Sequence, residues 1–328
     1  MDAANRKNEP RALARFQRRA RNALPFFVSA AFLAWIFARI DVRLALDAVT
    51  PEVVLRFAPV IAVFTVFTIA IDAQCLHRLV AARPDDAAPL SRRAAARIRI
   101  ACYPIGVLNH LLGAGGLALL VRRRTGASIA VATGFVLLLA LLDVGAVLTA
   151  IALGGSGLRI GSVGLQVGVV ATSIATLVAG FLFLRAPVDL GALEAVRALP
   201  LFNAARLVPL SALAELALLR LGTVACFASL VAGLFLAFDV PVSPVRVVFG
   251  VGIMLAVAAL PLAVAGIGTG QVVFVAVFSG LAPDAELLGM SIVLSTAILA
   301  TRSTLGLLFA SEYGRAPTAT TSGDAIDG

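Results

Sequence analysis

Two charged residues that interrupt long apolar stretches are the first positions at which this sequence could do chemistry. Asp143 and Arg302 each lie inside such a stretch. If these stretches cross a bilayer, a lone charge costs about 2.5–3.5 kcal/mol at its centre, so such residues usually pair or face a polar cavity. We therefore expect Asp143 and Arg302 to form an ion pair or to face a route for a polar headgroup. A structural ion pair or packing contact is the alternative, and the planar guanidinium of Arg302 could also bind a phosphate.

Two glycine-containing interruptions form the second group of candidate site residues. The first contains Asn109, His110, Gly113, Gly115 and Gly116, and the second contains Gly266, Gly268, Gly270 and Gln271. Paired, Gly/Pro-interrupted segments in two halves of a membrane protein mark the binding site of many transporters. His110 could carry a proton, and Gln271 with free helix N–H groups could bind an anionic headgroup. Turn formation, helix capping and close packing are the structural alternatives for these residues.

The sequence offers little for catalysis or metal binding. It has two histidines and three cysteines, and the cysteines form no CxxC motif. The adjacent acids Asp85 and Asp86 follow a proline in a polar turn, where a solvated loop explains them. A transferase acting on a lipid carrier would need a cluster of carboxylates and a base, or a metal site. We therefore predict no metal, no cofactor and no enzymatic activity.

The composition indicates an integral membrane protein. Hydrophobic residues make up 60% of the chain, charged residues only 14%, and the mean hydropathy is +1.01. A soluble protein has about 25% charged residues. The net charge of +9 does not indicate nucleic-acid binding, because the basic residues flank apolar stretches as cytoplasmic loops do. Those after the second stretch are Arg78, Arg83, Arg92, Arg93, Arg97 and Arg99.

Apolar stretches of helical length define the elements that must position the candidate residues. We predict an all-α polytopic membrane protein with about six full transmembrane helices and two broken or re-entrant helical hairpins in pseudo-symmetric halves. The six helices are expected at 24–40, 53–73, 127–153, 162–184, 208–238 and 286–310. Residues 1–22 form a basic amphipathic segment, 23–311 a single transmembrane domain, and 312–328 a polar, disordered tail. Glu215 and Arg220 are expected to snorkel or to pair with loop groups near the inner interface.

The two hairpins follow from length and charge. Residues 98–121 could span the bilayer as a Gly-rich helix. They could instead enter, turn near 109–116 and return, which keeps Arg122–Arg124 on the cytoplasmic side and is the interpretation we favour. Residues 245–260 and 272–281 are joined by a break, and the second limb is too short to span alone. Both termini are expected in the cytoplasm of a bacterial inner membrane.

The sequence from Asn109 to Gly126, with its Gly-Ala-Gly-Gly and Arg-Arg-Arg elements, resembles the lysylphosphatidylglycerol synthase transmembrane (flippase-like) family. So does the Pro-to-Gly-x-Gly element of residues 260–271. The resemblance covers roughly residues 20–312 and implies a free-standing protein that moves lipids or lipid-linked precursors between leaflets. The chain departs from the family pattern in polar residues. The departures are Leu117, Leu119, Leu120, Ala140, Leu141 and Gln271.

Three functions stay open from the sequence. The first is translocation of a lipid or lipid-linked precursor, with membrane lipids of anionic or isoprenoid headgroup as partners. The second is a non-catalytic scaffold or regulatory subunit that binds envelope-biosynthesis enzymes. The third is a membrane-embedded lipid-carrier transferase, which the missing carboxylate cluster disfavours.

Overall fold

The structure is a computed structural model that describes residues 49–82, 88–108, 110–157, 206–259 and 268–314, with isolated positions between them. Every regular element in these ranges is helical. Four helices are long and apolar enough to cross a membrane, which confirms a helical architecture compatible with a multi-pass membrane protein. They are α3 (Pro51–Ala81), α7 (Ile129–Gly157), α11 (Leu210–Ala237) and α14 (Asp284–Leu308). The helices expected at 24–40 and 162–184 lie outside the described ranges.

The helix starts follow from local sequence. Helix α3 begins with Pro51, and the Thr50 side chain accepts a hydrogen bond from the Val53 N–H at 3.3 Å. Ser243 caps α12 (Pro244–Ala258) in the same way, again with a proline in the first turn. A hydroxyl cap satisfies one free N–H, and proline fits a position whose N–H has no helical partner.

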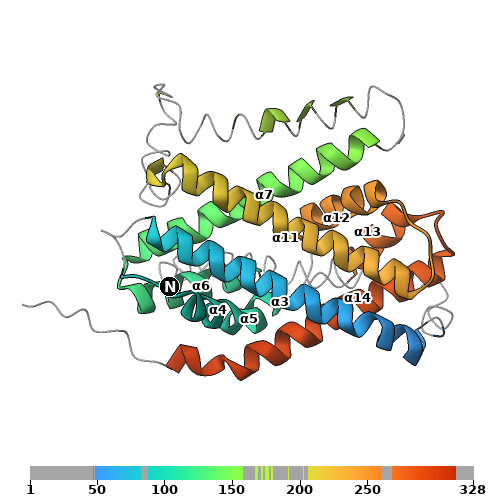
Figure 1. Cartoon of the computed structure of the whole chain (residues 1–328), viewed down its shortest axis with the longest axis horizontal. Coiled ribbons are helices and arrows are strands. Elements are labelled where there is room, and N and C mark those ends of the chain that lie inside the picture. The colour runs from blue at the N-terminus through green and yellow to red at the C-terminus, as the bar shows by residue number, and fades with distance from the viewer. Residues whose placement is uncertain are drawn as a thin grey trace, which may run out of the picture.

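The long helices run side by side, and short helices occupy the two ends of the bundle (Figure 1). Helices α4 (Arg92–Ala101), α5 (Tyr103–Leu108) and α6 (His110–Thr125) lie at one end. Helices α12 and α13 (Thr269–Phe278) lie at the other. Helix α11 packs against both α3 and α7. Each short helix has fewer than the roughly 20 residues that a bilayer requires.

Both sets of short helices form tight hairpins. Helices α5 and α6 pack so closely that a Cβ atom on Gly113 would lie 2.5 Å from the Gly106 Cα. Helices α12 and α13 also pack together, and the Arg246 guanidinium near the start of α12 donates to the Ser279 carbonyl after α13, at 2.6 Å. The expectation that 113–116 belongs to the turn is wrong, because these residues are helical in α6. Helix α5 ends at Leu108 and α6 begins at His110; Asn109 between them lies outside the described residues.

The position of the arginine triplet agrees with a hairpin at residues 98–121. The Ala88 N–H donates to the Thr125 carbonyl at 2.7 Å, and Arg124 forms an ion pair with Glu312 beyond the end of α14. The end of α6 therefore lies beside the loop that precedes α4. A helix that spanned from α4 to Arg124 would place these groups at opposite ends of the bundle.

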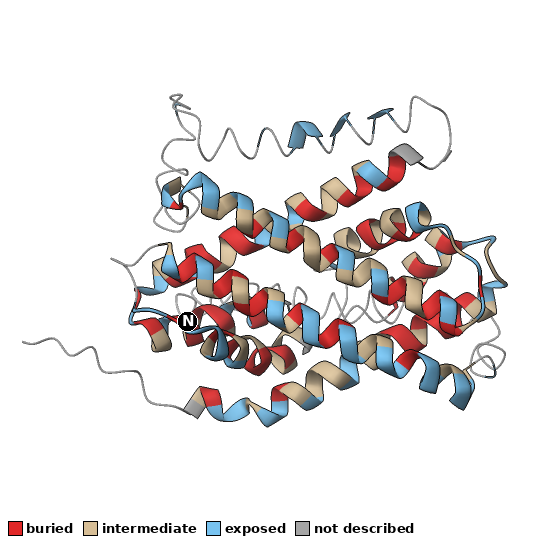
Figure 2. Ribbon diagram, viewed as in Figure 1, coloured by how far each residue is buried: buried red, intermediate tan, exposed pale blue. Residues whose placement is uncertain are grey.

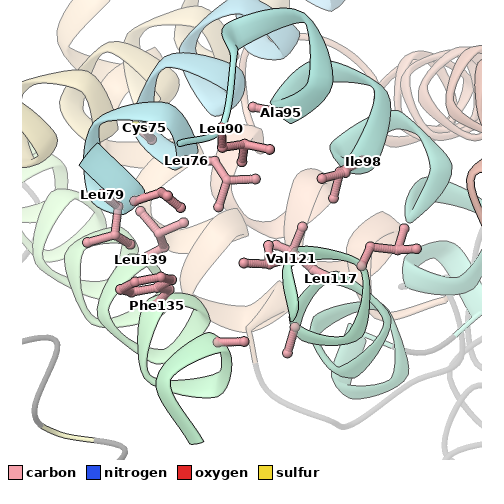
Figure 3. Packing of buried hydrophobic residues seen from close by; sticks show 14 of the residues in the cluster. Cys75, Leu76, Leu79, Leu90, Ala95, Ile98, Leu117, Val121, Phe135 and Leu139 are labelled. Atoms are coloured by element: carbon pink, nitrogen blue, oxygen red, sulfur yellow. The ribbon is translucent and has the colours of Figure 1, made fainter. Parts of the chain in front are cut away.

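Two apolar clusters hold the bundle together. One joins the second half of α3 to α4, α6 and the first half of α7, and it contains Leu76, Ile98, Val121 and Phe135 (Figure 3). The other surrounds the α12–α13 hairpin, where the rings of Phe235, Phe274 and Phe278 contact one another in one aromatic group. The polar residues described below lie along the helices that connect the two clusters.

Much of the outer surface is apolar. Buried positions face the inside of the bundle, while exposed positions run along the outer faces of the long helices (Figure 2). Several exposed side chains are large and apolar, including Leu55 at 75%, Leu218 at 68% and Leu307 at 69% exposure. Exposed apolar surface of this kind is typical of proteins that contact a membrane or another protein, and it agrees with helices that are apolar enough to cross a membrane.

Candidate functional site

Asp72 is the centre of a buried ion-pair network. One carboxylate oxygen accepts a hydrogen bond from the Arg99 Nε, and the other accepts one from an Arg220 terminal nitrogen, each at 2.8 Å. The Asp72 and Arg220 side chains are only 9% and 4% exposed. Charge-assisted hydrogen bonds of this kind are strong. A buried charge still depends on its partners, since loss of one partner leaves an uncompensated ion.

Three helices bring this network together. Asp72 lies in α3, Arg99 in α4 and Arg220 in α11, and α3 packs against both of the other helices. Arginine side chains are long enough to span such helix contacts while their methylene groups cover apolar surface.

Asp143 on α7 extends the network. Its carboxylate lies 3.3 Å from the same Arg220 nitrogen that binds Asp72. The Asp143 side chain is 47% exposed, so it faces open space on one side. The Nε of Arg220 is buried and has no hydrogen-bond partner in the structure.

Arg302 on α14 differs from the other arginines. Within the part of the chain that the structure describes, it makes no ion pair; its guanidinium carbon lies 5.4 Å from the Tyr103 ring centre and 6.0 Å from that of Phe227. Such cation–π contacts hold a guanidinium in place without neutralising its charge. The expected ion pair between Asp143 and Arg302 is therefore wrong, because Arg220 lies closer to Asp143 and takes that role.

All five charged residues line one cavity of about 170 Å³. Its wall also contains small, apolar and aromatic residues from α3, α5, α6 and α7. The lining residues are Asp72, Leu76, Arg99, Cys102, Tyr103, Gly106, Gly113, Ala114, Leu117, Val136, Leu139, Ala140, Asp143, Arg220 and Arg302. The alternative expectation for Asp143 and Arg302, that both face a common polar space, agrees with this wall. Three arginines against two aspartates leave one net positive charge.

The glycine-containing breaks contribute unequally to this cavity. Gly113 lines it, whereas Gly115 faces open space and Gly116 lies against Tyr313. The side chain of His110 is not among those described, and Asn109 falls in a gap of the described ranges.

The second break takes no part in the described cavity wall. Gln271 accepts a hydrogen bond from the Gly268 N–H at 2.6 Å and donates one to the Ser295 hydroxyl at 3.3 Å. It therefore caps α13 and ties it to α14, as the structural alternative proposed. Gly270 has open space beside it, and Gly266 lies outside the described residues. Gly268 has φ of 90°, a backbone conformation that favours glycine.

Three charged residues of the cavity were not predicted as site residues from the sequence. Asp72 was expected at the very end of the helix at 53–73, Arg99 among the arginines of the cytoplasmic loop that follows, and Arg220 at the interface beside Glu215. Helix α3 instead continues to Ala81, with buried residues on both sides of Asp72. The apolar spacing of Cys75, Leu76 and Leu79 after Asp72 was the available signal, because it continues the helical period past the charge. Glu215 does form an ion pair, with Arg78 in the last turn of α3 at 2.8 Å.

No group of three or more metal-binding side chains occurs among the described residues. Comparison of the chain with models of protein families, with curated proteins and with solved structures gave no match. The geometry of the cavity is therefore the basis for a functional assignment.

Proposed function

We propose that this chain is an integral membrane protein that translocates a lipid or lipid-linked precursor between leaflets, or assists that translocation. The observation that carries the proposal is the charged cavity enclosed by helices long enough to cross a bilayer. Asp143 lies near the middle of α7 and Arg220 well inside α11. Ionisable residues at such depth are costly and mark substrate pathways.

The cavity provides what a lipid headgroup needs. A headgroup must lose water to cross hydrocarbon, and ionic and polar side chains can replace part of that hydration. The acyl chains can stay in the bilayer, because the outer faces of the helices are apolar. No covalent step is required, so the protein acts as a route and not as an enzyme.

The two hairpins support a gated route. One lies at each end of the bundle (Figure 1), and the α5–α6 hairpin contributes Tyr103, Gly106 and Gly113 to the cavity wall. Movement of one hairpin at a time would open the bundle to one leaflet at a time, as in alternating access. The resemblance to the flippase-like family leads to the same proposal.

We place the α4–α6 end in the cytoplasm. The exposed or half-buried arginines at this end are numerous, whereas the described residues at the other end include Arg56 and Arg246. An excess of arginine marks the cytoplasmic side. The arginines at the α4–α6 end are Arg78, Arg92, Arg93, Arg97, Arg122, Arg123 and Arg124.

Leaflet-resolved lipid analysis tests the proposal. Cells that lack the chain are compared with cells that produce it, using a membrane-impermeant reagent that labels lipid headgroups from outside. We expect one lipid class to lose external labelling when the chain is absent, and the wild-type chain to restore it. An unchanged distribution of every lipid class would contradict translocation.

A further inference from the structure

The charges around the cavity do not balance. Arg99 and Arg220 are matched by Asp72 and Asp143 through direct ion pairs. Arg302 is a further cation in the same wall, and in the described ranges it forms neither an ion pair nor a hydrogen bond. A cation among apolar helices is stabilised by a counter-ion. The cavity therefore favours an anionic ligand beside Arg302.

The Arg220 guanidinium is a second, independent feature that favours a ligand carrying a hydrogen-bond acceptor. The Arg220 Nε is buried without a hydrogen-bond partner, and the Arg220 side chain, only 4% exposed, lines the cavity. Buried N–H groups in proteins are nearly always hydrogen-bonded. A single terminal nitrogen of Arg220 contacts both aspartates, so the remaining N–H groups of this guanidinium could donate to a group bound in the cavity.

The size of the cavity limits the ligand. Its volume of about 170 Å³ is similar to that of an engineered protein cavity of about 150 Å³ that holds one benzene molecule. A phosphate group has fewer heavy atoms than benzene and fits this space. A sugar with its hydroxyl groups is larger and would lie outside.

We propose that the cavity binds the phosphate of a phosphate ester, with Arg302 as the principal contact and Arg220 and Arg99 as supporting donors. The planar guanidinium presents paired N–H groups that match phosphate oxygens. Tyr103 and Phe227 fix the position of the Arg302 guanidinium. The assignment of this ester to a lipid rests on the proposed function, whereas phosphate binding itself does not.

Ligand-induced stabilisation of the purified full chain in detergent micelles tests this inference. The probes are dioleoylphosphatidylglycerol, phosphate-free dioleoylglycerol and inorganic phosphate. Affinities are compared for wild type, Arg302→Gln and the control Arg122→Gln, which removes the same charge from an exposed site on α6. Charge-assisted hydrogen bonds of this strength correspond to a roughly tenfold to hundredfold change in affinity.

We expect phosphatidylglycerol to raise the unfolding midpoint and dioleoylglycerol to leave it unchanged. Arg302→Gln should weaken phosphatidylglycerol binding by this factor, while Arg122→Gln binds like wild type. Stabilisation by inorganic phosphate as well would show that the phosphate group alone suffices, and its absence would assign the site to a lipid headgroup. If Arg302→Gln does not fold, Arg302→Lys replaces it. Lysine keeps the positive charge but lacks the paired N–H groups of the guanidinium, so this variant should bind phosphatidylglycerol several-fold more weakly than wild type.

Equal affinity in Arg302→Gln and Arg122→Gln, or equal stabilisation by the two lipids, would overturn the inference. Phosphate binding without any lipid translocation would overturn the proposed function alone. Translocation that is unaffected by Arg302→Gln would overturn the phosphate site and leave the translocation route standing.

Discussion

At the residue scale, Asp72 is the main counter-ion of the arginines in the site. It holds Arg99 and Arg220 at the same time, each through one oxygen at 2.8 Å. Asp143 has a longer contact of 3.3 Å and is far more exposed. The two aspartates therefore contribute differently, although both line the cavity and both interrupt apolar sequence.

The first prediction compares Asp72→Asn with Asp143→Asn. Asp72→Asn leaves two arginines without their carboxylate and should lower the free energy of unfolding by about 3–5 kcal/mol. Asp143→Asn should lower it by about 0–1 kcal/mol, as for an exposed pair. Unfolding of the purified variants in detergent measures both changes. Equal losses in the two variants would refute the central position of Asp72.

The second prediction concerns coupling between charged residues. A double-mutant cycle of Asp72→Asn with Arg220→Met should give an interaction free energy of about 0.5–3 kcal/mol, because the two side chains share a buried ion pair. The cycle of Asp143→Asn with Arg302→Gln should give a smaller value, since Asp143 pairs with Arg220 and not with Arg302. A larger coupling in the second cycle would restore the ion pair that the sequence suggested.

At the scale of elements, the α5–α6 hairpin depends on close contact between two glycines. The Gly106 and Gly113 backbones touch where the helices pack, whereas Gly115, two residues along, has nothing within 4 Å of a Cβ position. Tyr313 after α14 closes the other side of this hairpin, and its hydroxyl donates to the Cys102 thiol at 3.5 Å. Burial raises the pKa of Tyr313, so this hydroxyl keeps its proton at neutral pH.

The third prediction follows from this contrast. Gly113→Ala should destabilise the protein by about 1–3 kcal/mol, because an added methyl group overpacks the helix contact. Gly115→Ala is the matched control on the same helix and should be neutral or slightly stabilising, since alanine favours helix. The unfolding midpoints of both variants give the comparison. Equal stability of the two would mean that α5 and α6 do not pack as described.

Sequence alone anticipated the long helices but not the charge network. Apolar length and flanking arginines predict α7, α11, α14 and the start of α3 within a few residues, because those features decide membrane insertion. The end of α3 was missed, since this helix continues past Asp72 to Ala81. The Asp72–Arg99–Arg220 contacts depend on how three helices pack, which no local pattern records. Asp143 and Arg302 could be found because each interrupts an apolar stretch, but their partners could not. The Gln271 cap was foreseeable, since free N–H groups at a helix start need an acceptor.

At the scale of the whole molecule, the fold has a hairpin at each end, and the charged cavity lies between the α5–α6 hairpin and the long helices. The Arg-rich end contains α4 to α6, and the other contains α12 and α13 (Figure 1). The proposed membrane orientation and the proposed route both rest on this arrangement.

The fourth prediction tests that orientation. Cysteines introduced at Arg92 and Arg122 should react with an impermeant thiol reagent only from the cytoplasmic side, and one at Asp284 only from outside. The background carries serine or alanine at Cys75, Cys102 and Cys226. Labelling of positions 92 and 122 from opposite sides would mean that 98–121 crosses the bilayer.

Lipid translocation in reconstituted vesicles tests the central claim most directly. The full chain is placed in vesicles that contain NBD-phosphatidylglycerol, and dithionite quenches the probe in the outer leaflet. Ala140 lies in the cavity wall, so Ala140→Phe places a large side chain in the cavity. Leu141→Phe is the control at the exposed position next to it. The account predicts that wild type and Leu141→Phe expose inner-leaflet probe to quenching, and that Ala140→Phe slows this strongly. Quenching of the outer leaflet alone with wild type, or equal rates with Ala140→Phe, would contradict the cavity as a lipid route.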